Sequence, residues 1–374
     1  MKRRIACLLV VFAFIARIAA AENLDTPADA AYIVDYQTGA VMLDKNGEAR
    51  IEPASLTKLM TVYVVFAQLR SGKLRLTDSF TVTEHAWRTQ GSKTFVELGN
   101  QIKLDDLLRG IIVQSGNDAC VVVAEGVAGS EAAFADRMNA EAKRLGMMNT
   151  HFVNSDGWPD PNHYTTARDL AVLAQHLIAD FPEYYHYFAE IDFTYHGIKQ
   201  GNRNPLLYKN VGVDGLKTGH AEGPGYSLVA SGVQNGRRII MAVHGLKSMQ
   251  SRADEGIRLW NWGFQNFENY KIVKANTPLV DAPVWLGKQP TVPLAAKSDV
   301  VITRPRGAHD QVKATAVFDG PVPAPVEAGR QVGTLRIEAP GMAPLEVPLV
   351  TAGEAARLGT FHRILVAAGR LVGG

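Results

Sequence analysis

Three short motifs that lie far apart along the chain limit its possible folds more than any other feature. Ser55-Leu56-Thr57-Lys58, Ser115-Gly116-Asn117 and Lys217-Thr218-Gly219 each occur once, and their first residues are 60 (115 − 55) and 102 (217 − 115) positions apart. Each motif alone has an ordinary structural explanation as a helix start, a helix cap or a strand end. Together they contain two serines and two lysines, so we expect a fold that gathers three distant segments at one cleft.

The first motif opens a predicted helix. Pro53 precedes a strongly apolar stretch from Ser55 to Leu69, which predicts a buried helix with Ser55 at its N-terminus. Residues three apart share a helix face, so Lys58 lies beside Ser55 among apolar neighbours. Burial there disfavours the ammonium form and favours Lys58 as the base that activates a serine nucleophile.

The second motif is predicted to lie in a loop between two helical stretches. From such a loop, Ser115 can relay a proton to a leaving amine, and Asn117 can hold a substrate amide and Lys58. Capping of a helix by Ser115 or Asn117 is the structural alternative.

The third motif ends a predicted strand. Lys217 and Thr218 would face the carboxylate of a bound peptide, and Gly219 permits a substrate backbone to approach the strand edge closely. His220 could serve either the cleft or the turn that follows.

The N-terminus has the composition of a secretory signal peptide. Lys2, Arg3 and Arg4 precede twelve apolar residues, and small residues follow up to Ala21. Twelve apolar residues are too few to span a bilayer, so a transmembrane helix is not expected. The small residues indicate cleavage after Ala21. The remaining chain has 39 − 4 = 35 basic against 37 acidic residues. This balance, without a long basic run, gives no electrostatic footprint for nucleic acid.

Cysteine and metal chemistry are not expected. Cys7 leaves with the signal peptide, so Cys120 stays alone and an intramolecular disulfide is excluded. We expect Cys120 to be a small buried hydrophobe beside three valines. The ten histidines show no His-Glu-x-x-His pattern or matching ligand cluster, so we predict no metal and no cofactor.

Two folded domains are predicted after the signal peptide. Strands are expected at 31–36, 40–43, 226–233 and 238–243, and helices at 55–69, through much of 104–177 and at 251–267. Eleven of the eighteen prolines lie between Pro278 and Pro348, among short alternating runs typical of a small β-rich domain. The predicted segments are 1–21 (signal peptide), 22–271 (catalytic domain), 272–350 (β-rich domain) and 351–374 (C-terminal helix).

The C-terminal tail has one apolar side if it is helical from Glu354 to Gly374. Leu358, Phe361 and Ile364 lie on that side, with Arg363 and Arg370 opposite. Such a helix can lie in a membrane interface. Glycines within it and an arginine in the apolar arc count against this interpretation, and a helix docked on the β-rich domain stays open as the alternative.

The motif set resembles that of low-molecular-mass penicillin-binding proteins, the D-alanyl-D-alanine carboxypeptidase family, over nearly the whole chain. The Ser-Gly-Asn variant, the run Val213–His220, Asn202-Arg203-Asn204 and the approach Pro53-Ala54 carry the resemblance. It implies an α/β (α+β) domain like that of transpeptidases and β-lactamases, with a central antiparallel sheet flanked by helices. A small β-rich domain and an amphipathic C-terminal helix would follow.

The resemblance also implies a reaction. Ser55 would attack the bond between two D-alanines of a peptidoglycan stem peptide, release the terminal D-alanine, and leave an acyl-enzyme that water hydrolyses. Lys58 would be the base, and Ser115 and Lys217 the second proton-transfer pair. The backbone NH groups of Ser55 and His220 would form the oxyanion hole.

Further expectations concern binding and location. Thr218 and Arg252 would recognise the substrate carboxylate, whereas Arg203 is interpreted as structural. β-Lactam antibiotics would be covalent inhibitors. The protein would be periplasmic and peripherally anchored to the outer face of the cytoplasmic membrane by the C-terminal helix.

Three other functions share some of these features. An endopeptidase acting on cross-links would use the same chemistry, and an inert cell-wall scaffold would keep the fold. A class A β-lactamase needs a glutamate on the loop after the second motif. The loop 154–162 contains none, and only Asp156 or Asp160 could substitute.

Overall fold

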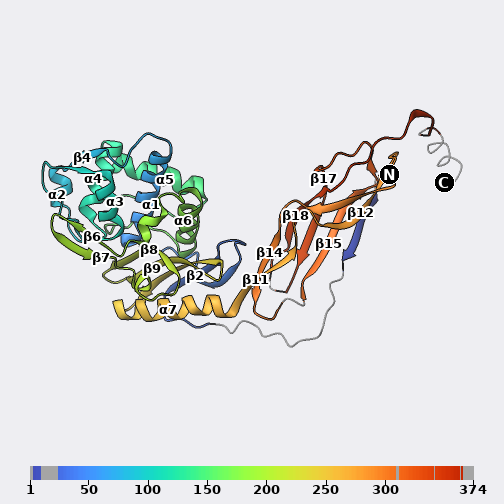
Figure 1. Ribbon diagram of the computed structural model, residues 1–374. Coiled ribbons are helices and arrows are strands. Elements are labelled where there is room, and N and C mark those ends of the chain that lie inside the picture. Colours follow the sequence, from blue (N-terminus) through green and yellow to red (C-terminus); the bar gives the residue numbers. More distant parts are fainter. Residues whose placement is uncertain (1–2, 10–23, 309–310, 341, 363, 365–374) are drawn as a thin grey trace. The chain divides into compact units, whose positions relative to one another are not determined.

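The computed structural model describes residues 3–9, 24–308, 311–340, 342–362 and 364, and it divides into two compact units (Figure 1). The larger unit is Asn23–Gln265, and the smaller unit is Asn266–Gly374 together with Met1–Glu22. The division lies at 265/266 rather than at the predicted 271/272, because strand β11 (Phe267–Val273) pairs with β14 (Val300–Pro305) inside the smaller unit.

The larger unit is built on a five-stranded antiparallel sheet in the order β3-β2-β10-β9-β8. Its strands are β2 (Ala30–Asp35), β3 (Val41–Lys45), β8 (Val213–Ala221), β9 (Gly225–Gln234) and β10 (Arg237–Leu246). All the predicted strands are present. Because β2 pairs with β10, the two ends of the unit meet in the sheet, and β8, which carries the third motif, is an edge strand.

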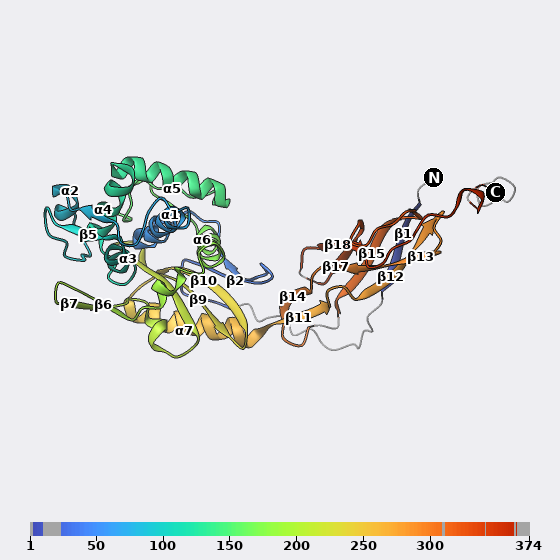
Figure 2. The same cartoon turned by 45° about the horizontal axis from the view of Figure 1, so that its top comes forward.

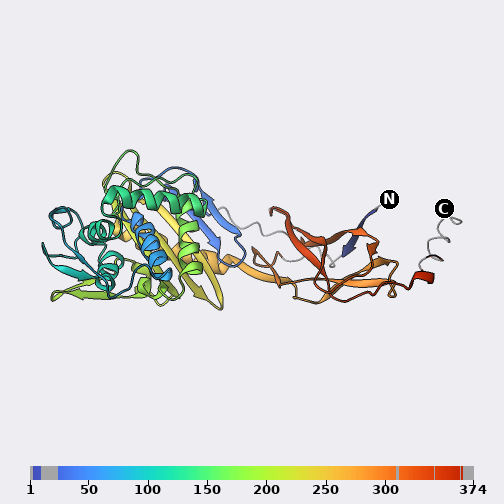
Figure 3. The same ribbon diagram turned by 90° about the horizontal axis from the view of Figure 1, so that it is seen from above.

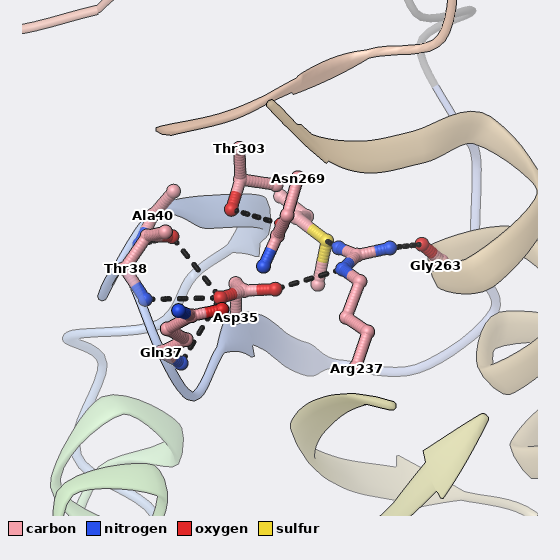
Figure 4. Close-up of polar contacts among 9 residues, drawn as sticks. Asp35, Gln37, Thr38, Ala40, Arg237, Gly263, Asn269 and Thr303 are labelled. Atoms are coloured by element: carbon pink, nitrogen blue, oxygen red, sulfur yellow. Dashed lines mark hydrogen bonds and ion pairs between the residues drawn. The ribbon is translucent and has the colours of Figure 1, made fainter. Parts of the chain in front are cut away.

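The turn between β2 and β3 is organised by one buried carboxylate. Asp35 Oδ1 accepts hydrogen bonds from the backbone NH groups of Gln37 and Thr38, and Asp35 Oδ2 pairs with Arg237 Nε at 2.8 Å (Figure 4). Arg237 Nη1 also donates to the carbonyl of Gly263 (Figure 4). These contacts connect the hairpin, β10 and the last helix of the unit.

Helices cover both faces of this sheet. They are α1 (Lys58–Arg70), α2 (Glu84–Arg88), α3 (Leu104–Ile112), α4 (Asn117–Ala128), α5 (Glu131–Leu145), α6 (Ala167–Asp180) and α7 (Met249–Asn266). α6 packs on one face of the sheet, and α7 lies against the other, where Gly256 faces Leu228 (Figure 1). α1 is central in the helical layer and contacts α3, α4, α5 and α6 (Figure 3).

Short elements complete the larger unit, and the sequence pattern did not predict them. Two small hairpins are β4 (Ser79–Thr81) with β5 (Gln101–Lys103) and β6 (Asp192–Tyr195) with β7 (Ile198–Gly201), the latter visible at one end of the unit (Figure 2). The 3-10 turns are η1 (Ala54–Thr57), η2 (Tyr185–Ala189) and η3 (Pro205–Tyr208).

The smaller unit is β-rich, as predicted. A sheet in the order β1-β15-β17-β18-β13-β12-β16 accompanies the β11–β14 pair. The strands are β1 (Arg3–Leu9), β12 (Pro278–Trp285), β13 (Thr291–Ala296), β15 (Lys313–Gly320), β16 (Val322–Pro323), β17 (Gln331–Glu338) and β18 (Leu345–Thr351). Alternating residues such as Phe318, Leu335 and Leu349 form its apolar core.

The N-terminal segment contributes the edge strand of that sheet. Arg3–Leu9 pairs antiparallel with β15 as β1, while residues 1–2 and 10–21 lie outside the described residues. The signal peptide stays a prediction. Because β1 has a neighbour on one side only, its removal with a signal peptide would leave the other strands paired and expose the edge of β15.

The predicted C-terminal helix starts later than Glu354. Ala355 pairs with Val326, and Arg357 pairs with Gly287, so the chain stays extended against the smaller unit through Leu358. Helical residues begin at Thr360. The predicted start was wrong because main-chain pairing outweighs the apolar periodicity there; residues 363 and 365–374 of the tail lie outside the described residues. Among the helices that the structure describes, none is long and apolar enough to cross a membrane.

Candidate active site

Ser55 lies in a fixed turn at the entrance to α1. The 3-10 turn η1 leads directly into α1, so the half-buried Ser55 stands one helical turn before Lys58, as predicted. Two glycines allow other segments to contact this turn. A Cβ on Gly157 would lie 1.8 Å from the carbonyl oxygen of Ala54, and a Cβ on Gly219 would lie 3.1 Å from that of Pro53. Close backbone packing therefore fixes Ser55 from both sides.

The amine of Lys58 is buried and has three acceptors. The residue is 1% exposed, and Nζ donates to Ser55 Oγ at 2.9 Å, to Asn117 Oδ1 at 2.8 Å and to the carbonyl of Asp156 at 2.5 Å. Asn117 is in turn held by its Nδ2, which donates to the carbonyl of Gln90. The first two motifs thus contact the same amine, and two of its three partners, Asn117 Oδ1 and the Asp156 carbonyl, can only accept.

Ser115 and Lys217 form a second serine–lysine pair. Lys217 Nζ donates to Ser115 Oγ at 3.0 Å, and both residues are almost fully buried. Burial lowers the pKa of Lys217 well below its ordinary value, and the nearby positive charges of Lys58 and Arg203 act in the same direction. A lysine in this state can accept and return a proton.

The helix cap proposed for the second motif is not observed. Gly116 occupies the N-cap of α4, and no side chain caps the helix. Ser115 has a left-handed backbone, with φ +60°. The next carboxylate, Asp118, accepts hydrogen bonds from the backbone NH groups of Thr94, Phe95 and Val96, which holds the 90–96 loop beside the motif. This loop and the motif are therefore organised together.

The third motif lies on the free edge of β8. Thr218 is buried, and His220 is exposed with its ring 4.1 Å from that of Tyr226 on β9. Gly219 packs against the η1 turn, where its missing side chain accommodates Pro53 and Leu56. The small residue that was expected to admit a substrate backbone thus has an observed packing function.

Two arginines stand near Lys217. Arg252 of α7 is 7% exposed, its Nε has no hydrogen-bond partner, and its guanidinium lies 5.6 Å from the Tyr226 ring. Burial lowers the pKa of Arg252 to about 10, and the charge of Arg203 also lowers it. Within the described part of the chain, neither of these arginines forms an ion pair. Such a group of unpaired positive charges can bind a carboxylate.

Arg203, which the sequence led us to interpret as structural, lies near Lys217 and Arg252. Its Nη1 donates to Ser92 Oγ at 2.7 Å, and its carbonyl accepts from Arg252 at 3.5 Å. The flanking asparagines are buried, and Asn204 Nδ2 donates to the carbonyl of Gly215 on β8. The run Asn202-Arg203-Asn204 was the available signal, since two buried amides fix an arginine between them.

The loop after the second motif closes the site behind Lys58. Asp156 contributes its carbonyl to Lys58, and its carboxylate accepts from Trp158 N at 2.8 Å. Asp160 is exposed, and its carboxylate accepts from Asn162 N. A backbone carbonyl can come from any residue type, so no sequence signal predicts this contact.

The remaining candidate ligands and thiol behave as ordinary interior groups. Cys120 is fully buried and free, as predicted, and burial raises the pKa of its thiol. His163 is buried against Thr57, with His163 Nε2 2.8 Å from Thr57 Oγ1. Among the described residues, no group of three His, Cys, Asp or Glu side chains is placed to hold a metal ion.

Comparisons with known proteins match both units. Residues 17–248 match the family described as D-alanyl-D-alanine carboxypeptidase, and residues 267–357 match the C-terminal domain of penicillin-binding protein 5. The chain is 40% identical to D-alanyl-D-alanine carboxypeptidase DacC of Escherichia coli K12 over 92% of this chain and 89% of that protein.

Solved structures agree with these sequence matches. Penicillin binding protein 5 from Haemophilus influenzae superposes with a TM-score of 0.80 at 38% identity, covering 89% of this chain and all of that one. Ampicillin-bound penicillin-binding protein D2 from Listeria monocytogenes superposes with a TM-score of 0.60 at 27% identity, covering 65% of this chain and 99% of that one.

Proposed function

The chain belongs to the D-alanyl-D-alanine carboxypeptidase family of serine peptidases, and from this premise we propose how its own residues perform the reaction. The enzyme is a serine-type D-alanyl-D-alanine carboxypeptidase with a penicillin-binding protein fold. The observation that supports the residue assignment best is the single buried amine of Lys58, held between Ser55 Oγ, Asn117 Oδ1 and the Asp156 carbonyl.

Acylation starts from the neutral form of Lys58. A neutral amine has two N–H bonds and one lone pair, and the Asn117 and Asp156 oxygens can only accept. When these oxygens take the two N–H bonds, the lone pair points at the hydroxyl of Ser55. Lys58 then accepts the Ser55 proton as Oγ attacks the carbonyl between the two D-alanines.

Other groups stabilise the oxyanion and protonate the leaving group. The backbone NH groups of Ser55 and His220 stabilise the negative oxygen of the tetrahedral intermediate. The Lys217–Ser115 pair delivers a proton to the departing nitrogen of the terminal D-alanine. The proton that Lys58 took from Ser55 replaces the one that the Lys217–Ser115 pair gave up, so Lys58 is neutral again. Lys58 then accepts a proton from the water that hydrolyses the acyl-enzyme and returns it to Ser55 Oγ as the ester bond breaks.

The substrate carboxylate binds where the cations converge. Thr218 and Lys217 present their polar groups from β8, and Arg252 and Arg203 supply positive charge without a protein carboxylate to neutralise it. The unpaired edge of β8 accepts the stem peptide as an additional extended strand. A β-lactam, which carries a carboxylate beside its reactive carbonyl, acylates Ser55 in the same position.

The proposed place of action is the periplasm. Residues 1–21 act as the export signal, and the tail from Thr360 lies in the outer face of the cytoplasmic membrane. Phe361 and Ile364 are 72% and 63% exposed in the structure, which leaves them free to insert into lipid. The peptidoglycan stem peptides are reached from this position.

Product analysis with a peptide ending in D-Ala-D-Ala tests the proposal. We expect release of one D-alanine by the wild-type enzyme, no release by Ser55→Ala, and one penicillin adduct on the peptide that contains Ser55. The matched substrate with a C-terminal amide should react at least about tenfold more slowly, because it lacks the charge that the cations bind. A penicillin adduct that persists in Ser55→Ala would show that another residue is the nucleophile.

A further inference from the structure

Asp156 presents two different groups to the reaction centre. Its main-chain carbonyl accepts directly from Lys58 Nζ, and its side chain is a carboxyl group that is only 4% exposed. The mechanism above uses the carbonyl alone. The buried carboxyl group beside a catalytic amine is therefore unaccounted for.

The surroundings of this carboxyl group are mostly closed and contain few charges. Its charge interacts with Lys58 on α1 and Glu131 on α5 and with the Cys120 thiol on α4. The charge of Lys58 also acts on Lys217 of β8 and on His163. Asp156 Oδ1 accepts from Trp158 N. Burial raises the pKa of the Asp156 carboxyl, and the positive charge of Lys58 acts in the opposite direction. The two groups therefore sense each other's charge.

The loop that carries Asp156 is held in place by its neighbours. Asn154 Oδ1 accepts from Gly157 N, and the hydroxyl and NH of Ser155 both donate to Glu131 Oε1. Thr61 Oγ1 donates to the carbonyl of Ser155, and Gly157 contacts the η1 turn so closely that a Cβ would not fit. These contacts fix the backbone from which the carboxyl group projects, and the hydrogen bond from Trp158 N holds Asp156 Oδ1 itself.

The coupling between Asp156 and Lys58 acts through space. Their hydrogen bond uses the Asp156 carbonyl, and the carboxylate forms no ion pair with Lys58 among the described residues. In an interior of low effective dielectric, a charge can still shift the pKa of a neighbouring group by about one unit or more. An ionised Asp156 stabilises the ammonium form of Lys58, whereas a protonated Asp156 does not.

We propose that Asp156 is a positioning residue for the reaction at Ser55, in which its carbonyl orients the amine of Lys58 and its enclosed carboxyl group controls how readily that amine gives up its proton. This inference rests on the proposed roles of Ser55 and Lys58. It makes the pH range of acylation a property of the loop after the second motif. A neutral residue at position 156 widens that range toward acid.

The first test compares Asp156→Asn with the wild-type enzyme. Asparagine keeps the main-chain carbonyl and an oxygen that can accept from Trp158 N, so it removes mainly the charge. The rate of acylation by a fluorescent penicillin is measured from about pH 4 to pH 9. We expect the acid limb of the profile to move about 1 pH unit toward lower pH. Asp160→Asn, on the exposed part of the same loop, is the matched control and should leave the profile unchanged.

The second test measures the effect of Lys58 on the titration of Asp156, and it does not depend on the Asp156→Asn variant. The carboxyl group of Asp156 is titrated by carbon-13 NMR in the wild-type protein and in Lys58→Met. Because coupling between two sites is reciprocal, loss of the cation should move this titration to higher pH by a similar amount. A titration that is the same in both proteins would overturn the inference.

The outcomes distinguish a failure of the inference about Asp156 from a failure of the proposed function. If the wild-type protein is acylated at Ser55 but the acid limb of Asp156→Asn does not move, even with a uniform loss of rate, Asp156 is only structural and the inference is wrong. If penicillin does not acylate Ser55 at all, the proposed function fails and the inference fails with it.

Discussion

Lys217 Nζ lies 3.0 Å from Ser115 Oγ, although the two residues are 102 positions apart in the chain. The contact joins the edge strand of the sheet to the loop that precedes α4, with both side chains nearly inaccessible to solvent. If the two groups act as one proton-transfer unit, their effects should not add.

Single and double substitutions test this unit. Lys217→Ala and Ser115→Ala should each lower kcat/KM for a pentapeptide by about 10²–10⁴-fold, the usual contribution of a positioned acid or base. The double variant should be little worse than either single one. Steady-state kinetics on the three variants provide the measurement, and a double variant whose loss is the product of the two single losses would disprove a joint role.

Gly157 should be irreplaceable for reasons of backbone geometry. It has φ +87°, and a Cβ there would lie 1.8 Å from the Ala54 carbonyl oxygen. Gly157→Ala must therefore displace either the 154–158 loop or the turn that carries Ser55, and we expect a loss of about 3 kcal/mol in unfolding free energy. Acylation should fall with it.

A second glycine, Gly72, distinguishes the cost of a positive φ from the cost of a steric clash. Gly72 also has a positive φ, +71°, but no atom lies within 4 Å of its added Cβ. Gly72→Ala should cost only about 1 kcal/mol and leave acylation intact. Equal urea midpoints for the two variants would show that the contact between Gly157 and Ala54 carries no energy.

His163 should make the stability of the larger unit fall in mild acid. Burial lowers the pKa of His163 to about 4 from its ordinary 6.5, because the ring packs beside Thr57 without an acidic hydrogen-bond partner. The unfolded chain therefore binds a proton that the folded one does not between pH 6.5 and 4. The neutral histidine's contribution is complete above pH 6.5 and is lost as the pH falls toward 4, by about 3 kcal/mol in total.

Thermal unfolding at several pH values checks this sign. His163→Gln should weaken the fall in Tm between pH 6.5 and 4, whereas His186→Gln, at an exposed histidine, should leave it as in the wild type. Parallel curves for wild type and His163→Gln would exclude His163 as the cause.

The sequence predicted the parts of the site that depend on residue type. Ser55, Lys58, Ser115, Asn117 and Lys217 form a marked pattern, and the structure brings all five side chains together. The Asp156 carbonyl and the backbone approach at Gly157 carry no residue signature, so only the folded chain reveals them.

The fold, like the site, has parts that the sequence pattern predicted and parts that it did not. Long strands and helices with clear periodicity were predicted, whereas hairpins of three or four residues per strand, β4–β5 and β6–β7, are too short for any period to be read. The tail shows the opposite error, because its helical periodicity begins at residues that pair instead with Val326 and Gly287.

The boundary of the tail leads to the last prediction, which concerns membrane attachment. Leu358 N donates to the carbonyl of Leu286 in the smaller unit, and helical residues begin at Thr360. Truncation after Leu358 should therefore release a folded enzyme that still binds penicillin into the soluble periplasmic fraction, because the active site lies entirely in the larger unit. Truncation after Thr351 should also release the protein, but with a lower Tm for the smaller unit, since the pairings at Ala355 and Arg357 are lost. Cell fractionation with a penicillin label follows the first property, and calorimetry of the purified proteins follows the second. If the Leu358 truncation still sediments with membranes, or the full-length protein does not, the tail is not the anchor.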